Sequence, residues 1–109
     1  MKDADMLACI LNSLKDPVLM ADLEHKIVYM NDAAVAHYSE GASLLGSSLL
    51  DCHNAKSGEI IREVLEALRN GEDERLITDN ERHRIFMRAV RGEDGELMGY
   101  YERYEPPGS

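Results

Sequence analysis

The sequence is poor in cysteine and in long apolar runs, and each shortage excludes a class of protein. The 109 residues include two cysteines, Cys9 and Cys52, which are too few for a disulfide framework. Because the chain also shows no apolar stretch typical of a signal peptide, we expect reduced thiols and a cytoplasmic location. No apolar run approaches the length of a membrane span, so no contact with a membrane is expected.

Basic residues are also scarce. Twelve lysines and arginines face 21 aspartates and glutamates, which gives a formal net charge of −9. Nucleic-acid surfaces need clustered Lys and Arg to contact phosphates, and anionic membranes attract the same residues. We therefore expect that this domain binds neither nucleic acid nor membranes.

Catalytic motifs are missing as well. Asp51, His53 and Ser57 have the residue types of a hydrolase triad, but neither a nucleophile elbow nor oxyanion-hole glycines accompany the serine. The sequence contains no His-Glu-x-x-His motif and no glycine-rich phosphate loop. We therefore expect a binding domain and no enzymatic activity.

Two stretches carry apolar residues at helical spacing. The first predicts an N-terminal flanking helix within residues 1–15, which the break at Pro17 would end. Its stripe consists of Met6, Leu7, Ile10, Leu11 and Leu14. The second predicts a longer helix over residues 58–70, with Asn54 or Ser57 as the N-cap. Its stripe consists of Ile60, Ile61, Val64, Leu65 and Leu68.

Short runs of apolar, β-branched and aromatic residues predict the strands. They lie at residues 17–22, 26–30, 75–78, 82–91 and 96–104. The first two would form a hairpin, and Asp94-Gly95 is a strong turn signal between the last two. A short helix is expected at residues 33–38, capped by Asn31 or Asp32. This order predicts an α+β domain, in which an antiparallel sheet carries helices over one face.

Side chains alternate between two faces along the predicted strand at residues 82–91. The face expected to point at the helices carries His83, Ile85, Met87 and Ala89. The outer face is expected to carry an apolar patch of Phe86, Val90, Tyr100 and Tyr104. Because such a patch usually marks a partner surface, we expect a homodimer formed through the N-terminal helix and the outer sheet face. The alternative is that the helix folds back over the patch within its own domain.

Several short motifs, in this order, resemble those of the PAS domain family. They are Asp16-Pro17-Val18 to Asp22, Ile27 to Met30 with the following Asn31-Asp32-Ala33-Ala34, Leu44-Leu45-Gly46, and Gly92 to Gly99. The resemblance implies a PAS fold with a five-stranded antiparallel sheet over residues 16–104, followed by a linker or tail at 105–109. It also implies a signal-sensing domain of a bacterial signalling or transcription-regulatory protein. The family's Asp-Ile-Thr ending is replaced here by Tyr104-Glu105-Pro106.

A narrower resemblance concerns residues 51–57. This stretch is similar to the His-Pro-x-x-Ser sequence in the haem-binding PAS domains of bacterial carbon-monoxide-responsive regulators, in which a histidine and a methionine hold the iron. The resemblance implies haem as the cofactor, with His53 and Met87 as the metal ligands. Such Met/His ligation raises the reduction potential of haem iron. Asn54 stands where that group has proline.

The residues themselves leave simpler roles open. His53 lies at a helix entrance, where it would bond the backbone or Ser57, and methionines such as Met87 often fill gaps in cores. Cys52 is expected to be a small buried thiol rather than a metal ligand or a redox switch. Three further histidines are expected to be solvent-exposed: His25, His37 and His83.

We expect a ligand-binding cavity between the sheet and the helix that follows His53. Its apolar lining is predicted to be Leu19, Ile27, Tyr29, Leu50, Ile61, Leu65, Ile85 and Ala89. Haem held by His53 and Met87 is the most specific hypothesis for the occupant. The alternative is a PAS module without haem, which binds another small molecule or acts as a homodimerisation domain.

Overall fold

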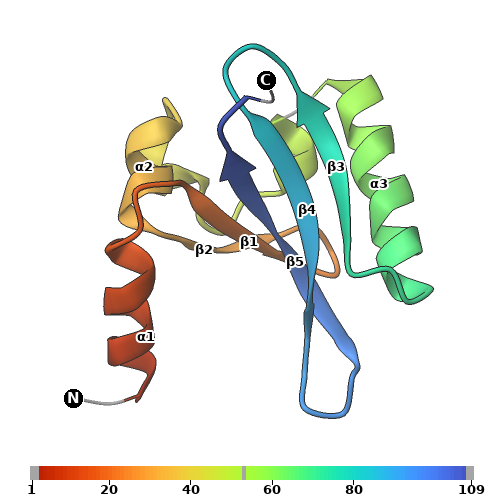
Figure 1. The fold of residues 1–109 in the computed structure, drawn as a ribbon, viewed down its shortest axis with the longest axis horizontal. Helices are drawn as coiled ribbons and strands as arrows, with labels where there is room; N and C mark the ends of the chain where they lie inside the picture. Colours follow the sequence, from red (N-terminus) through yellow and green to blue (C-terminus); the bar gives the residue numbers. More distant parts are fainter. Residues whose placement is uncertain (1–2, 53, 108–109) are drawn as a thin grey trace.

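The computed structural model describes residues 3–52 and 54–107. Over these residues the helical elements are α1 (Asp3–Asn12), α2 (Asp32–His37), η1 (Gly41–Leu44), η2 (Leu49–Cys52) and α3 (Ala55–Arg69), of which η1 and η2 are short 3-10 helices (Figure 1). The strands are β1 (Val18–Asp22), β2 (Ile27–Met30), β3 (Glu74–Asp79), β4 (Arg84–Arg91) and β5 (Leu97–Glu105). Within the described ranges, no helix is long and apolar enough to cross a bilayer.

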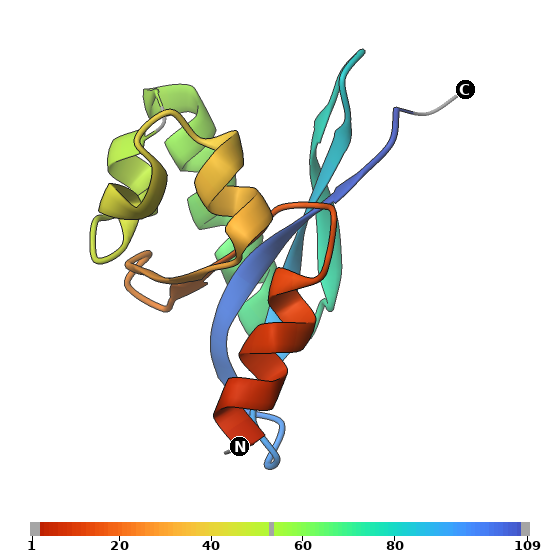
Figure 2. The same ribbon diagram turned by 90° about the vertical axis from the view of Figure 1, so that its left-hand side faces the viewer.

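The strands form one antiparallel sheet in the order β2-β1-β5-β4-β3, so the C-terminal strand lies at its centre. The helices α2 and α3 and the two 3-10 helices gather on one side of this sheet (Figures 1 and 2). The arrangement confirms the predicted fold class, an α+β domain with a five-stranded antiparallel sheet and helices on one face. The turn between β4 and β5 includes Gly95, whose φ of 81° is a conformation that glycine adopts readily.

The long helix α3 supplies most of the helical side of the core. Its N-cap is Asn54, whose side chain accepts a 2.9 Å hydrogen bond from the backbone N–H of Ser57, so the helix begins earlier than predicted. Its predicted stripe is buried at Ile61, Val64, Leu65 and Leu68. These side chains belong to one core with apolar residues of the inner sheet face, including Leu19, Ile27, Met87 and Tyr100.

The pairing of β4 with β5 corrects the predicted faces of the C-terminal strand. Ile85 pairs with Tyr104 and Met87 pairs with Glu102, and paired residues of antiparallel strands share a face of the sheet. Tyr104 therefore points toward the helices, and so does Tyr100, which is fully buried in the core. The prediction of an outer apolar patch is wrong for both tyrosines.

Charged side chains cover much of the outer face. Arg103 donates two hydrogen bonds of 2.6 and 2.9 Å to Glu74 of the edge strand β3. The guanidinium of Arg103 also lies 4.1 Å from the centre of the Phe86 ring, which is cation–π distance. Phe86 is therefore covered by a cation. An apolar groove remains elsewhere on this face, lined by Leu11, Leu14, Val18, Met20, Tyr29, Val90 and Tyr101.

The helix α1 lies apart from α3, at the opposite side of the molecule (Figure 1). None of its residues is buried, and Met6, Leu7 and Ile10 are 51%, 60% and 57% exposed. Its last turn is held by the side chain of Asn31, which donates a 2.9 Å hydrogen bond to the backbone carbonyl of Leu11. Most of the predicted apolar stripe is thus left in contact with solvent.

Candidate functional site

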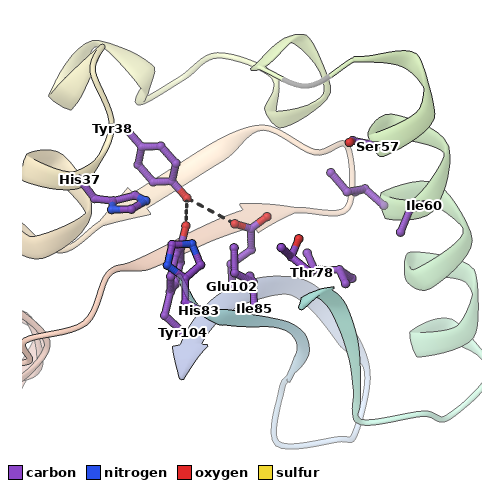
Figure 3. Close-up of a pocket in the computed structure, with 11 residues that line it drawn as sticks. His37, Tyr38, Ser57, Ile60, Thr78, His83, Ile85, Glu102 and Tyr104 are labelled. Carbon is purple, nitrogen blue, oxygen red and sulfur yellow. Dashed lines mark hydrogen bonds between the residues drawn. The ribbon is translucent and has the colours of Figure 1, made fainter. Parts of the chain in front are cut away.

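A cavity of about 250 Å³ lies between α2, α3 and the strands β3, β4 and β5 (Figure 3). Its position between the sheet and the long helix is the position at which the sequence predicts a ligand site. The wall is formed by His37, Tyr38, Ser57, Ile60, Ile61, Ile77, Thr78, His83, Ile85, Glu102 and Tyr104.

Three polar side chains meet on one wall of the cavity. The hydroxyl of Tyr38, the residue that ends α2, lies 2.6 Å from the hydroxyl of Tyr104 and donates to the Glu102 carboxylate at 3.4 Å (Figure 3). Glu102 is only 3% exposed and belongs to the central strand of the sheet. Burying a carboxylate is costly unless hydrogen-bond donors surround it. The pocket therefore contains a polar centre inside a largely apolar fold.

Burial keeps both tyrosine hydroxyls protonated. Burial raises the pKa of Tyr104 to about 12, and the negative charge of Glu102 adds to the effect. The pKa of Tyr38 is raised further above its ordinary value, first by burial and then by the charge of Glu102. At physiological pH each phenol is therefore neutral and offers one proton to donate and lone pairs to accept.

Two histidines flank this cluster at the rim of the cavity. The ring centre of His37 lies 5.3 Å from that of Tyr104 and 5.8 Å from that of His83, in edge-to-face arrangements. His37 is exposed, as predicted. His83 is half-buried, so the prediction of exposure is wrong for this residue. The prediction is also wrong for His25, which is half-buried with its Nδ1 2.9 Å from the hydroxyl of Tyr100.

Isoleucine side chains supply the apolar part of the wall. They are Ile60 and Ile61 from α3, Ile77 from β3 and Ile85 from β4. The hydroxyl groups of Ser57 on α3 and Thr78 on β3 face the cavity from opposite sides (Figure 3). An apolar wall with a few convergent polar groups is the usual composition of a small-molecule site.

The residues that the sequence predicts for the site lie in different parts of the structure: the cavity wall, the core and the outer groove. Ile61 and Ile85 lie on the cavity wall. Leu19, Ile27, Leu65 and Met87 belong to the buried core, and Leu50 and Ala89 pack against it. Tyr29 lines the groove on the outer face, so its assignment to the ligand cavity is wrong. His53 lies outside the described residues, and its role stays a prediction.

Haem held by Met87 does not fit this arrangement. Met87 is 0% exposed in the core and is not part of the cavity wall, so its sulfur would reach an iron atom only if the core rearranged. The cavity, at about 250 Å³, is also smaller than the roughly 300–1,000 Å³ typical of drug-sized ligand sites. Within the described residues, no group of three His, Cys, Asp or Glu side chains is placed to hold a metal ion.

Sequence reasoning missed the polar centre formed by Tyr38, Glu102 and Tyr104. A glutamate on a strand is expected to be solvated, because charged side chains are rarely buried without a partner. Tyrosines at positions 100, 101 and 104 place aromatic rings on both faces of β5, so alternation alone does not orient the strand. The register that pairs Ile85 with Tyr104 orients β5, and this register is seen only in the folded sheet.

The fold and the cavity define a small α+β domain with a partly polar pocket between its sheet and its helices. A family model described as PAS domain matches residues 7–105. The chain therefore belongs to the PAS domain family, which confirms the resemblance seen in the sequence motifs. The narrower resemblance to haem-binding regulators is not confirmed.

Solved structures show the same fold. The chain is similar to a C-terminal domain from Streptococcus mutans, with 23% identity, coverage of 94% of this chain and 84% of that chain, and a TM-score of 0.78. It is similar to a PAS domain from Colwellia psychrerythraea, with 13% identity, coverage of 96% and 97%, and a TM-score of 0.72. For the Aer2 receptor of Vibrio cholerae, a dual PAS-heme oxygen sensor, the values are 19% identity, 84% and 93% coverage, and a TM-score of 0.62. Comparison with curated proteins gives no significant match.

Proposed function

We propose that this PAS domain is a sensory module that binds a small, non-haem molecule in the cavity between α3 and β3–β5. The observation that carries the proposal is the position of Glu102, a 3% exposed carboxylate on the wall of a cavity. A core position without a ligand role would be more stable with an apolar side chain, because burying a charge costs free energy that its partners rarely return in full. Buried charged groups in a cleft are therefore candidates for function.

The shape of the cavity supports a small ligand. Its volume of about 250 Å³ falls just below the roughly 300–1,000 Å³ of ordinary ligand pockets, which favours a ligand smaller than a typical drug. The ring of isoleucines would contact an apolar part of the ligand, while Tyr38, Thr78 and Glu102 would orient its polar part. The heme sensor among the similar structures does not change this view, since 19% identity shows only a shared fold.

The test is an NMR titration of the ¹⁵N-labelled domain with a collection of polar fragments. We expect a subset of fragments to shift amide signals of the cavity residues in a saturable way. Thr78→Phe, which places a ring in the cavity, should abolish these shifts. Val28→Phe, at a strand position that is 47% exposed, should leave them unchanged. Fragments that bind equally well to the Thr78→Phe variant would place the ligand site elsewhere.

We propose homodimerisation through α1 as a second function. The observation that favours it is the exposure of Met6, Leu7 and Ile10 on a helix without buried residues, next to the apolar groove of the outer face. A second copy would bury both surfaces, which are otherwise unfavourable in water. Light scattering coupled to size-exclusion chromatography should show a dimer that Leu7→Glu converts to a monomer. Leu45→Glu, at a 47% exposed position after η1, should leave the dimer intact. A monomeric wild-type domain would contradict the proposal.

A further inference from the structure

We propose that His37 and His83 form a binding site for a divalent transition-metal ion, such as Zn²⁺ or Cu²⁺, at the rim of the cavity. The two imidazoles would supply two ligands, and water would complete the coordination shell. The inference goes beyond the proposed function, because this site needs no small molecule inside the cavity. It follows from the distance between the two rings and from the absence of other partners for them among the described residues.

The distance between the two rings suits a single metal ion. His37 is the last residue of α2 and His83 precedes β4, and the fold brings their ring centres to 5.8 Å from each other. With metal–nitrogen bonds of about 2.1 Å, the centres of two imidazoles on one ion are roughly 5–6 Å apart. The ring planes are inclined by 66°, and the terminal torsion of a histidine is soft. Rotation of the exposed His37 ring can therefore direct one of its nitrogens toward an ion shared with His83.

The ring nitrogens of both histidines are available to a metal. Across residues 3–52 and 54–107, neither side chain takes part in a hydrogen bond or an ion pair, and their contacts are with aromatic rings. His25 differs, because its Nδ1 lies 2.9 Å from the hydroxyl of Tyr100. His37 is exposed and His83 is half-buried, so an ion can reach both from solvent. A neutral imidazole with a free nitrogen is the commonest metal ligand in proteins.

The surroundings hold both histidines near their places. The side-chain oxygen of Asn80 accepts hydrogen bonds of 2.9 and 3.1 Å from the backbone N–H groups of Arg82 and His83, which fixes the turn before β4. The ring of Tyr104 packs against both imidazoles, with centres 5.3 Å from that of His37 and 5.0 Å from that of His83. Ligands positioned in this way lose less conformational freedom when an ion binds.

The chemistry of the donors selects the class of ion. Imidazole suits Zn²⁺, Cu²⁺ and Ni²⁺, whereas Mg²⁺ and Ca²⁺ prefer carboxylate and carbonyl oxygens. In the part of the chain that the structure describes, no group of three His, Cys, Asp or Glu side chains surrounds a common point, so the ion would keep water ligands and exchange readily. The net charge of −9 raises the local concentration of cations around the domain. A bound ion would link the end of α2 to the start of β4 across the rim.

The experiment titrates Zn²⁺, Cu²⁺ and Mg²⁺ separately into the tag-free domain and measures binding by calorimetry. The Cys9→Ser background removes an exposed thiol that would also bind these metals. We expect one Zn²⁺ per chain, Cu²⁺ bound at least tenfold more tightly than Zn²⁺, and no saturable binding of Mg²⁺. His37→Gln and His83→Gln should each weaken Zn²⁺ at least tenfold. His25→Asn is the matched control and should leave the dissociation constant unchanged.

Amide spectra of the ¹⁵N-labelled domain locate the ion and show that each variant is folded. We expect Zn²⁺ to shift the signals of residues around His37 and His83 in the same saturable way. Zinc binding that both single variants retain would overturn the inference, and so would the absence of saturable binding. Loss of binding in His53→Gln alone would also overturn it, because the ligand would then lie outside the described residues. None of these results bears on the cavity, whose fragment titration is carried out without metal.

Discussion

The side-chain amide of Asn31 donates a 2.9 Å hydrogen bond to the backbone carbonyl of Leu11, and this contact ties the end of α1 to the start of α2. The same amide donates to the carbonyl of Asp16, and its oxygen accepts from the backbone N–H groups of Val18 and Ala34. One fully buried side chain therefore satisfies backbone groups of α1, β1 and α2. Because Tyr38 at the other end of α2 lines the cavity, this short helix connects the cavity to the flanking helix.

We predict that Asn31→Ala destabilises the domain by about 2–4 kcal/mol, because a helix cap is lost and buried backbone groups are left unpaired. Amide hydrogen exchange in α1 should accelerate at the same time, since the tether to Leu11 is removed. Asn54→Ala is the matched control. Asn54 caps α3 in the same way but is exposed, so its loss should cost about 1 kcal/mol and leave exchange in α1 unchanged. Urea unfolding and exchange mass spectrometry measure both effects, and equal losses in the two variants would contradict the prediction.

His25 should make stability depend on pH. Burial, and then the positive charge of Arg62, lower the pKa of His25 below its ordinary value of 6.5. Tyr100, whose pKa is raised by burial, stays protonated, and its hydroxyl lies 2.9 Å from Nδ1 of His25. As the pH falls below 6.5, the imidazole of His25 is protonated in the unfolded chain but stays neutral in the folded chain. Stability therefore decreases from pH 6.5 down to the lower pKa of the folded state.

The His25→Asn variant tests this prediction, because asparagine tolerates the positive φ of 67° at this position but does not titrate. The variant should lose part of the decrease in unfolding free energy between pH 7.5 and pH 5.5, measured by urea unfolding at several pH values. Identical pH profiles of the variant and the wild type would show that His25 does not contribute.

Gly99 should tolerate no side chain. A Cβ atom at this position would lie 2.3 Å from the backbone carbonyl oxygen of Ala21 on the neighbouring strand β1. We predict that Gly99→Ala costs about 2–3 kcal/mol of stability, because the two strands must move apart. Gly58→Ala is the contrasting control. The new methyl group would meet only Leu50 at 3.8 Å, and the change should stabilise α3 by about 0.5–1 kcal/mol. Thermal unfolding distinguishes the two directions.

Haemin should not bind through Met87. We predict that Met87→Leu, a swap of similar volume in the core, costs less than about 1.5 kcal/mol. Absorption spectra of the wild type and the variant, titrated with haemin and then reduced under carbon monoxide, should be the same. A six-coordinate spectrum in the wild type that Met87→Leu abolishes would contradict this prediction. His53→Ala, tested in the same way, addresses the ligand that lies outside the described residues.

The sequence by itself determined the elements of this domain and their order. The apolar stripe of α3, the β1–β2 hairpin and the Asp94-Gly95 turn are local patterns, and the structure confirms each of them. The inward direction of Ile85 and Met87 was also readable, because alternation along a single strand needs no knowledge of its neighbours. These local signals, in the right order, were sufficient to identify the family.

Only the tertiary structure decided which residues form the cavity. The strand β5 carries tyrosines on both faces, so its orientation depends on its register against β4, which pairs Met87 with Glu102. The contact between Tyr38 and Glu102 joins residues 64 positions apart, and no local pattern encodes it. A buried carboxylate also contradicts the rule that charges stay in water. Glu102 lies at the centre of the sheet because β5 is the central strand, and the Tyr38 hydroxyl donates a hydrogen bond to it there.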